Sequence, residues 1–377
     1  MKIDVLIEHG TVIDPSTGHS GKYDVAITGD RIVGILEPGT VGGDIQRRVN
    51  AEGCLVTPGL IDIHAHIFEA VPQMGVKPDN FGVDQGVTTI ADAGSSGEQN
   101  FHDFVERSVK QNATEVLAWL NISSPGLVEG RSELADLNRL VVESTLARIA
   151  EYPETIIGIK ARMSGSVVKG SGISPLAVAK SVARRAELPV MVHIGNAPPK
   201  LQDVLDLMEE GDVLTHAFHG KPGGILDEHG QLIPQAQRAL DRGVRFDVGH
   251  GSASFSFATM NRARELGITP YSISTDLYLV NWLNGPVYSL TTTMTKFLAL
   301  GYSIDQIIEW TTAAPARILR KSDDIGTLKV GTIADISILK IVDQPVELID
   351  SENEKLSYNK LIQAQYTMKS GELYTCK

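Results

Sequence analysis

The sequence has few cysteines and lacks any long hydrophobic run. Its two cysteines, Cys54 and Cys376, lie far apart, and neither has another cysteine nearby. This spacing excludes a disulfide framework and a zinc site built from cysteines. No run of about 18 apolar residues occurs, so no membrane-spanning helix is predicted. Residues 1–10 also lack the apolar stretch of a signal peptide. We therefore expect a cytoplasmic protein that does not bind membranes.

Positive charge is also scarce. The 377 residues include 34 lysines and arginines against 46 aspartates and glutamates, which gives a formal net charge of −12. An acidic surface argues against nucleic acid or an anionic membrane as a partner. The remaining composition, with 42% hydrophobic residues, is that of a globular protein with ample core. A small-molecule substrate is therefore the expected partner.

The hydrophobic pattern changes near Leu55. Before it, short alternating runs separated by glycine and turn residues indicate β-structure. After it, apolar runs of strand length alternate with amphipathic stretches of helix length, as in βαβ units. The predicted strands span residues 56–67, 87–93, 115–122, 155–163, 189–194, 212–218, 245–249 and 271–275. The predicted helices span residues 101–111, 133–151, 175–186, 201–210, 234–241, 256–266, 291–300 and 304–319.

Eight strands alternating with helices favour an α/β protein with a (β/α)8 TIM barrel. The alternative is an open doubly wound sheet, which normally has fewer strands and often a glycine-rich phosphate turn that this sequence lacks. After Leu319 the pattern becomes β-like again, in residues 326–335 and 336–339. We expect this tail to pack against the N-terminal strands. Residues 1–55 and 325–377 would then form a small β-sandwich domain, and residues 56–324 the barrel.

Chemically reactive side chains stand at the ends of several predicted strands. His64 and His66 end the first strand, and residues two apart in a strand point the same way. The C-terminal strand ends are where barrel enzymes place their active sites. Each side chain also has a structural explanation: a lysine can reach the surface, a histidine can belong to the core, and an aspartate can cap a helix. Together they predict a metal site, whose candidates are His64, His66, Lys160, His193, His216 and Asp276.

Two segments resemble the amidohydrolase superfamily, and the resemblance extends over essentially the whole chain. Residues 58–66 (PGLIDIHAH) are similar to its opening motif, and residues 326–335 (GTLKVGTIAD) to its returning β segment. In the branch with a lysine on strand four, the resemblance implies that CO2 carboxylates this lysine, which then bridges two divalent metals. Lys160 would be the bridge. One metal would be held by His64, His66 and Asp276, and the other by His193 and His216.

Zinc suits these ligands, with iron, cobalt or manganese as alternatives. Two such metals lower the pKa of a shared water, and the bridging hydroxide attacks a carbonyl polarised by one of them. Asp276 would take the proton and return it to the leaving group as the catalytic base and acid. Enzymes of this family are usually homo-oligomers, so we expect one here.

Two departures from related sequences narrow the reaction. Dihydroorotases carry an arginine two residues after the HxH motif, where this chain has Phe68. Nucleobase deaminases have a glutamate shortly after the strand-five histidine, whereas residues 194–199 contain none. The remaining pattern resembles the deacetylase-like, or dihydroorotase-like, branch. We therefore predict hydrolysis of a small N-acetylated amino acid or O-acetylated hydroxy acid.

Three alternatives remain open at this point. They are hydrolysis of a cyclic amide as in dihydroorotase, deamination of a nucleobase, and a non-catalytic scaffold. The complete set of ligands argues against the scaffold.

Five further residues are candidates for substrate contacts. Arg162 shares a strand face with Lys160, so it either binds a substrate carboxylate or lies outside the pocket. His250 ends the seventh strand and would orient substrate, stabilise an oxyanion or support the site from behind. Asn196, His219 and Tyr278 lie in loops that follow predicted strands.

Overall fold

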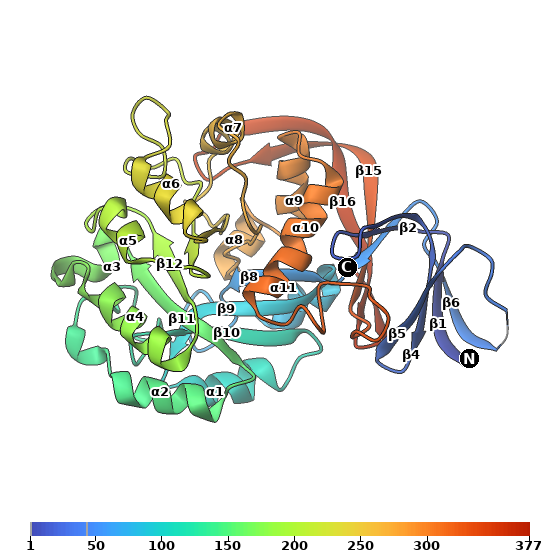
Figure 1. The fold of residues 1–377 in the computed structure, drawn as a ribbon, viewed down its shortest axis with the longest axis horizontal. Helices are drawn as coiled ribbons and strands as arrows, with labels where there is room; N and C mark the ends of the chain where they lie inside the picture. The colour runs from blue at the N-terminus through green and yellow to red at the C-terminus, as the bar shows by residue number, and fades with distance from the viewer. Residues whose placement is uncertain (1, 43) are drawn as a thin grey trace.

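The computed structural model describes residues 2–42 and 44–377, and its largest unit is a parallel sheet covered by helices (Figure 1). Seven strands follow one another in the order β14-β13-β12-β11-β10-β9-β8. Each adjacent pair is parallel. The strands are β8 (Leu60–Ala65), β9 (Val87–Gly97), β10 (Glu115–Asn121), β11 (Ile156–Met163), β12 (Val190–Ile194), β13 (Val213–Thr215) and β14 (Arg245–Phe246).

The eighth predicted strand is irregular, although it does close the sheet. Isolated parallel bridges join Ser272 to Asp247 and Leu277 to Ala65. The Asp276 N–H also donates to the carbonyl of His64 at 2.7 Å. This segment forms no regular hydrogen-bond ladder, because side chains bond its backbone groups instead. The Leu277 N–H, for example, donates to the Thr275 hydroxyl. Residues 271–277 thus lie between β14 and β8, and the domain is TIM-barrel-like.

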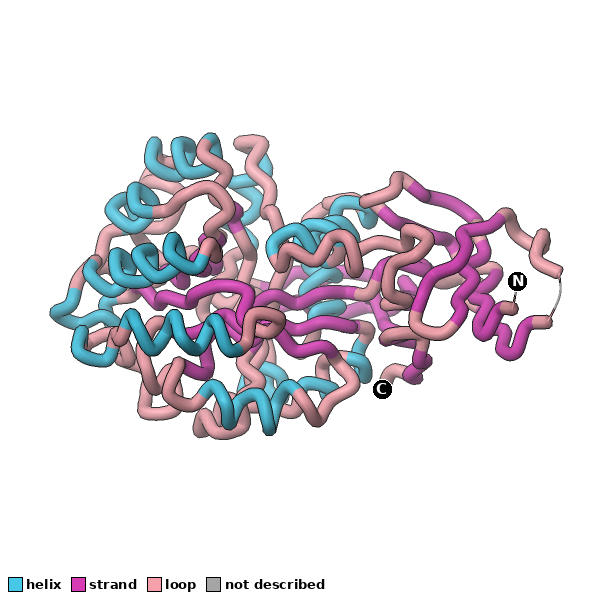
Figure 2. The backbone as a smooth tube through the Cα atoms, turned by 60° about the horizontal axis from the view of Figure 1, so that its bottom comes forward, coloured by secondary structure: helices cyan, strands magenta, loops and turns pink. Residues whose placement is uncertain are grey.

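Helices surround this sheet on the outside (Figure 2). In α4 (Ser174–Ala186), Pro175 occupies the first turn, and Leu176, Ala179 and Val182 form a buried stripe. The other α-helices are α1 (Phe101–Phe104), α2 (Val142–Glu151), α3 (Gly165–Val168), α5 (Leu201–Leu207), α6 (Pro234–Asp241), α7 (Phe257–Glu265), α8 (Leu279–Asn284), α9 (Leu290–Ala299), α10 (Ile304–Thr311) and α11 (Ala313–Ile318). Shorter turns are η1 (Pro78–Asn80), η2 (Val83–Gln85), η4 (Leu137–Arg139), η5 (Lys169–Ser171) and the π-helical η3 (Val105–Val109). Within the described residues, no helix is long and apolar enough to cross a membrane.

Two predicted helices differ from the structure. The helix expected over residues 133–151 begins only at Val142, because Asp136 accepts a hydrogen bond from the Asn138 N–H and caps a separate 3-10 turn. The helix expected over residues 304–319 is interrupted at Thr312, whose φ of −134° is not helical. Both breaks depend on single residues, which a hydrophobic periodicity does not register.

The chain ends form two further sheets, the first from N-terminal strands alone and the second from strands of both ends. One has the order β5-β4-β1-β6 and the other β17-β16-β15-β7-β2-β3. Their strands are β1 (Ile3–Glu8), β2 (Thr11–Asp14), β3 (His19–Lys22), β4 (Asp24–Thr28), β5 (Arg31–Leu36), β6 (Ile45–Asn50), β7 (Leu55–Pro58), β15 (Ile336–Ile349), β16 (Lys355–Lys369) and β17 (Glu372–Thr375). Val5 and Ile27 of the first sheet share an apolar cluster with Val56 and Ile338 of the second. The C-terminal tail therefore packs against the N-terminal strands. The sandwich topology and the domain boundaries stay predictions.

The first predicted strand, residues 56–67, is divided between two sheets. β7 pairs with β2 and β15, and β8 starts the barrel sheet at Leu60. The division falls at Pro58, which has no N–H, and at Gly59, whose N–H donates to the carbonyl of Asp335. A Cβ on Gly59 would lie 2.3 Å from the Thr88 hydroxyl oxygen, so only glycine fits here.

The C-terminal hairpin is longer than predicted and reaches the barrel. Residues 326–335 form a loop, and the strands β15 and β16 follow it. In the turn between them, Asp350 accepts hydrogen bonds from the backbone N–H groups of Phe257 and Glu352. The Ser351 hydroxyl donates to the carbonyl of Gly251. The hairpin turn therefore contacts the loop after β14, near α7 (Figure 1).

Candidate active site

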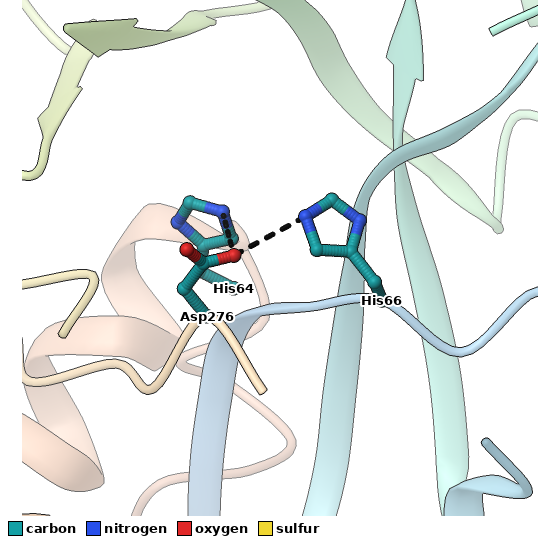
Figure 3. Close-up of side chains that lie close together, drawn as sticks. All are labelled: His64, His66 and Asp276. Atoms are coloured by element: carbon teal, nitrogen blue, oxygen red, sulfur yellow. Dashed lines mark ion pairs between the residues drawn. The ribbon is translucent and has the colours of Figure 1, made fainter. Parts of the chain in front are cut away.

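His64, His66 and Asp276 converge at one end of the parallel sheet (Figure 3). Asp276 Oδ1 lies 3.3 Å from His64 Nε2 and 3.2 Å from His66 Nε2. Ligand atoms about 2.0–2.1 Å from a tetrahedral zinc ion lie about 3.3 Å from one another. The spacing of these three side chains therefore fits a divalent cation, and they form a candidate metal-binding group.

The hydrogen bonds of His64 show which ring nitrogen faces the cluster as an acceptor. The Thr215 hydroxyl donates to Asp247 Oδ2 at 2.8 Å, so it accepts from His64 Nδ1, also at 2.8 Å. His64 Nε2 then carries a lone pair that points toward Asp276 Oδ1. A lone pair and a carboxylate oxygen repel each other, so this nitrogen needs a cation or a hydrogen-bond donor nearby, and Lys160 Nζ lies 3.2 Å from it. His64 is therefore oriented as a metal-ligating histidine would be, with its other ring nitrogen held by Thr215.

His216 is oriented in the same way. Its Nδ1–H donates to the carbonyl of Gly249, which leaves the Nε2 lone pair facing the cluster. This Nε2 lies 2.8 Å from His193 Nδ1 and 4.0 Å from Asp276 Oδ2. Burial lowers the pKa values of both imidazoles well below the ordinary range, so both rings are neutral. Neutral imidazole is the form that binds metals.

Lys160 is fully buried beside His64. Its Nζ lies 3.2 Å from His64 Nε2 and 3.1 Å from Met191 Sδ, and among the described residues it forms no ion pair with a carboxylate. Burial lowers the pKa of this lysine to about 7, so a substantial fraction is the neutral amine. Gly94 makes room for the lysine stem, because a Cβ there would lie 2.7 Å from Lys160 Cβ.

Two of these side chains sit on unusual backbone. His216 has a φ of 66° and Asp276 a φ of 51°, in the left-handed region that non-glycine residues seldom adopt. Each such residue costs of order 1–3 kcal/mol and persists where the surroundings hold it. His216 directly follows β13, and Asp276 follows the segment that lies between β14 and β8, so the strained positions are at strand ends beside the cluster.

We expect Thr215→Val to weaken metal binding by about 10- to 100-fold, the usual effect of removing a group that orients a ligand. Valine keeps the shape of threonine but leaves His64 Nδ1 without its acceptor. Competition with a chelator measures the affinity, and Thr215→Ser, which keeps the hydroxyl, is the matched control. Equal affinities for the valine variant and the wild type would show that the hydroxyl does not set the ring orientation.

A pocket of about 170 Å³ opens beside the cluster. It is lined by His66, Met74, Leu127, Arg131, Arg162, His193, Lys221, Ser252, Ala253, Ser254, Asp276 and Tyr278. The Ser252 hydroxyl and the Tyr278 hydroxyl are 2.8 Å apart, which joins the loops after β14 and after residue 275. Three basic side chains, from Arg131, Arg162 and Lys221, therefore surround the pocket in a protein whose net charge is −12.

The five candidate substrate contacts are placed differently. Arg162 and Tyr278 line the pocket, and Asn196 is exposed outside it. His250 is buried with both ring nitrogens engaged, since Nδ1 bonds the Gly251 carbonyl and Nε2 accepts from Lys296 Nζ at 2.8 Å. Its ring supports the loop and has no nitrogen free for substrate. His219 lines a larger neighbouring depression of about 540 Å³.

Several residues of the site were not found from the sequence. Asp247 accepts hydrogen bonds from the hydroxyls of Thr215, Ser272 and Ser274, and Thr215 links it to His64. Ser95 contacts His66 Nδ1 at 2.9 Å. Arg131 and Lys221 lie in the loops after β10 and β13. Their positions after predicted strands could have marked them as candidates, because loops after barrel strands build the active site. The hydroxyl partners give no comparable signal.

The fold and this site define a class of protein. A barrel of parallel strands that gathers imidazole, lysine and carboxylate groups at its C-terminal strand ends is an enzyme barrel with a candidate divalent-metal site. Residues 55–373 match the model of the Amidohydrolase family. The chain belongs to this family and is a hydrolase that acts on carbon–nitrogen bonds. The predicted family and enzyme class are thereby confirmed.

Individual relatives carry names of different reactions. The chain is 40% identical to a deacetylase of Enterococcus faecalis, over 99% of this chain and 100% of that protein. It resembles the solved structure of an adenine deaminase with a TM-score of 0.93 and 38% identity, covering 99% of this chain and 100% of that one. It also resembles a dihydroorotase structure with a TM-score of 0.90 and 32% identity, covering 99% of each chain. These similarities support the assignment to the family. Because the relatives carry names of different reactions, they do not identify the substrate.

Proposed function

We propose that this protein is a metal-dependent deacetylase that hydrolyses the amide or ester bond of a small acylated amino acid or hydroxy acid. The observation that carries this proposal is the basic pocket beside the metal-ligand cluster. A substrate carboxylate would meet positive charge there, while its acyl group reaches Asp276. The deacetylase name of the Enterococcus faecalis relative supports the same reaction.

The residues present suit a site for two divalent metals, and we propose zinc. His64, His66 and Asp276 would hold one ion, His193 and His216 the other, and Lys160 would bridge them as a carbamate. Forming this carbamate joins the neutral lysine nitrogen to CO2 and releases one proton, and the lowered pKa of Lys160 favours it. When bound, the metals would activate water and polarise the scissile carbonyl.

Asp276 is the proposed proton carrier. Its Oδ1 faces His64 and His66, whereas Oδ2 lies 4.0 Å from the nearest of the other imidazoles, that of His216. Oδ2 is therefore the oxygen that would take the proton from water and return it to the leaving amine or alkoxide. Tyr278, joined to Ser252, would form the opposite wall and exclude water from the reacting bond.

One buried residue and the chemistry of the pocket argue against the two alternative reactions. By the resemblance to this family, dihydroorotases have an arginine at the position of Phe68. Phe68 is fully buried, and the centre of its ring lies 5.5 Å from that of Phe104. A neutral nucleobase has no carboxylate that a basic side chain of this pocket would bind. Cyclic amide hydrolysis and nucleobase deamination are therefore second to deacetylation. A homo-oligomer and a cytoplasmic location stay predictions.

A substrate screen with metal-loaded protein tests this function. The panel holds both enantiomers of N-acetylamino acids, O-acetyl hydroxy acids, their primary amides or methyl esters, dihydroorotate and adenine. We expect acetate release from the free acids, with kcat/KM about tenfold or more above that of the neutral derivatives, the value of one charge-assisted hydrogen bond. Turnover of adenine or dihydroorotate alone would contradict the deacetylase assignment.

A further inference from the structure

We propose that Lys221 is the residue that recognises the substrate carboxylate, and that Arg162 is a positioning residue of the pocket wall. This inference rests on the proposed function and names the group that makes the same site specific for anionic substrates. It follows from the partners that the basic side chains of the pocket already have.

The charge of Arg162 is already neutralised. Its Nη1 lies 3.1 Å and 3.3 Å from the two carboxylate oxygens of Glu133, whose side chain is 1% exposed. A buried carboxylate with this single ion pair holds the guanidinium strongly, because losing the partner leaves an uncompensated charge. Arg162 also donates to the backbone carbonyl of Arg131. It therefore braces the loop after β10 and brings little net positive charge to the pocket.

The charge of Arg131 is the most exposed to water. This residue lies at the surface of the loop after β10. Interactions of solvent-exposed charges are screened by salt and contribute little. Arg131 can attract an anion toward the pocket, but it is poorly placed to fix one beside the reacting bond.

Lys221 is half-buried, and its ammonium lacks a partner. Across residues 2–42 and 44–377, its Nζ takes part in no ion pair and no hydrogen bond. Burial lowers the pKa of this lysine, and the nearby negative charge of Asp276 opposes that effect. A partly buried cation without an anion is costly. A carboxylate that enters the pocket would supply the missing partner, and Asp276 lines the same pocket.

The backbone around Lys221 is held while its side chain is left free. The Lys221 N–H donates to His219 Nδ1 at 3.1 Å, and the His219 carbonyl accepts from the Thr259 hydroxyl at 3.3 Å. His219 itself is 2% exposed. Lys221 lines both the catalytic pocket and the larger depression next to it. Lys221 is therefore part of the wall of both, and its ammonium could meet the carboxylate of a short substrate whose acyl group lies toward Asp276.

Lys221→Met tests this role with the N-acetylamino acid that ranks first in the screen and with its primary amide. We expect KM for the acid to rise about 10- to 100-fold while kcat changes little, and KM for the amide to stay near the wild-type value. Lys221→Arg should restore most of the preference for the acid. Lys200→Met, which removes an exposed lysine outside the pocket, should change neither KM.

The double variant Arg162→Met/Glu133→Gln distinguishes the role of Arg162 from that of Lys221, because it removes Arg162 without leaving Glu133 charged. We expect it to keep the preference for the acid over the amide. Loss of that preference in the double variant, or equal losses on acid and amide in Lys221→Met, would overturn the proposal.

A binding measurement keeps this inference separate from the proposed function. Metal-loaded Asp276→Asn protein, in which turnover is suppressed, is titrated calorimetrically with N-acetylalanine and with N-acetylalaninamide. We expect tighter binding of the acid, and loss of that difference when Lys221→Met is added. No preference for the acid would reject the role of Lys221. Failure of the wild type to release acetate from any panel compound would instead reject the deacetylase function.

Discussion

Asp276→Asn should lower kcat on amide substrates by about two to four orders of magnitude, the usual range for a lost general acid–base. The fold and much of the bound metal should remain. Asparagine still offers one oxygen where Asp276 Oδ1 faces His64 and His66. It presents an amide nitrogen or a neutral oxygen at the Oδ2 position, and neither can take the proton from water.

The size of this defect should depend on the leaving group. A departing amine needs the proton that Asp276 would return, whereas an activated aryl ester leaves without one. We therefore expect a larger loss on N-acetylamino acids than on aryl acetates, measured as kcat on the same metal-loaded preparation. A variant equally impaired on both would show that Asp276 acts by positioning metal alone. Wild-type kcat on amides would remove Asp276 from the mechanism.

Lys160→Ala should remove most of the bound metal and nearly all activity. Elemental analysis of the wild type, grown in metal-supplemented medium, should give about two divalent ions per chain. Alanine leaves His64 and its neighbours without the negatively charged bridge that would hold two cations close together. We expect the metal content of the variant to fall below one ion per chain.

Two controls separate a bridging lysine from a structural one. Lys296→Met also removes a buried lysine, which contacts His250 and not the cluster, so its metal content should stay near that of the wild type. Propionate should partly restore metal and activity to Lys160→Ala, because its carboxylate can take the place of the carbamate. A Lys160→Ala protein with both metals and normal turnover would make Lys160 a structural lysine.

The centre of the site could be predicted because it depends on strands. His64 lies in β8 and His66 follows one residue after its end, so the period of the strand predicts that both lie on one side. Lys160 and His193 also lie within their strands β11 and β12, whose C-terminal ends meet at the same edge. Spacing along the chain therefore sufficed to bring these groups together.

The pocket could not be predicted in the same way because its contacts join distant loops. Arg162 pairs with Glu133, which is 29 positions away in a loop without periodicity. The place of Lys221 in a loop after β13 makes it a candidate, but no sequence pattern records that its ammonium lacks a partner. The segment near Asp276 is irregular for a similar reason, since the side chain of Thr275 bonds Asp62, 213 positions away. Such partners depend on the finished fold.

The position of β15 has a consequence for synthesis of the chain on the ribosome. β7 lies between β2 and β15 in its sheet, and Thr57 bonds Ser337, 280 positions later. At about 5–20 residues per second, translation of that interval takes about 14–56 s. During this time one edge of β7 has no strand beside it, and unpaired edges recruit other chains. We therefore expect nascent chains that stall before β15 to aggregate or to bind chaperones, even when most of the barrel has been made.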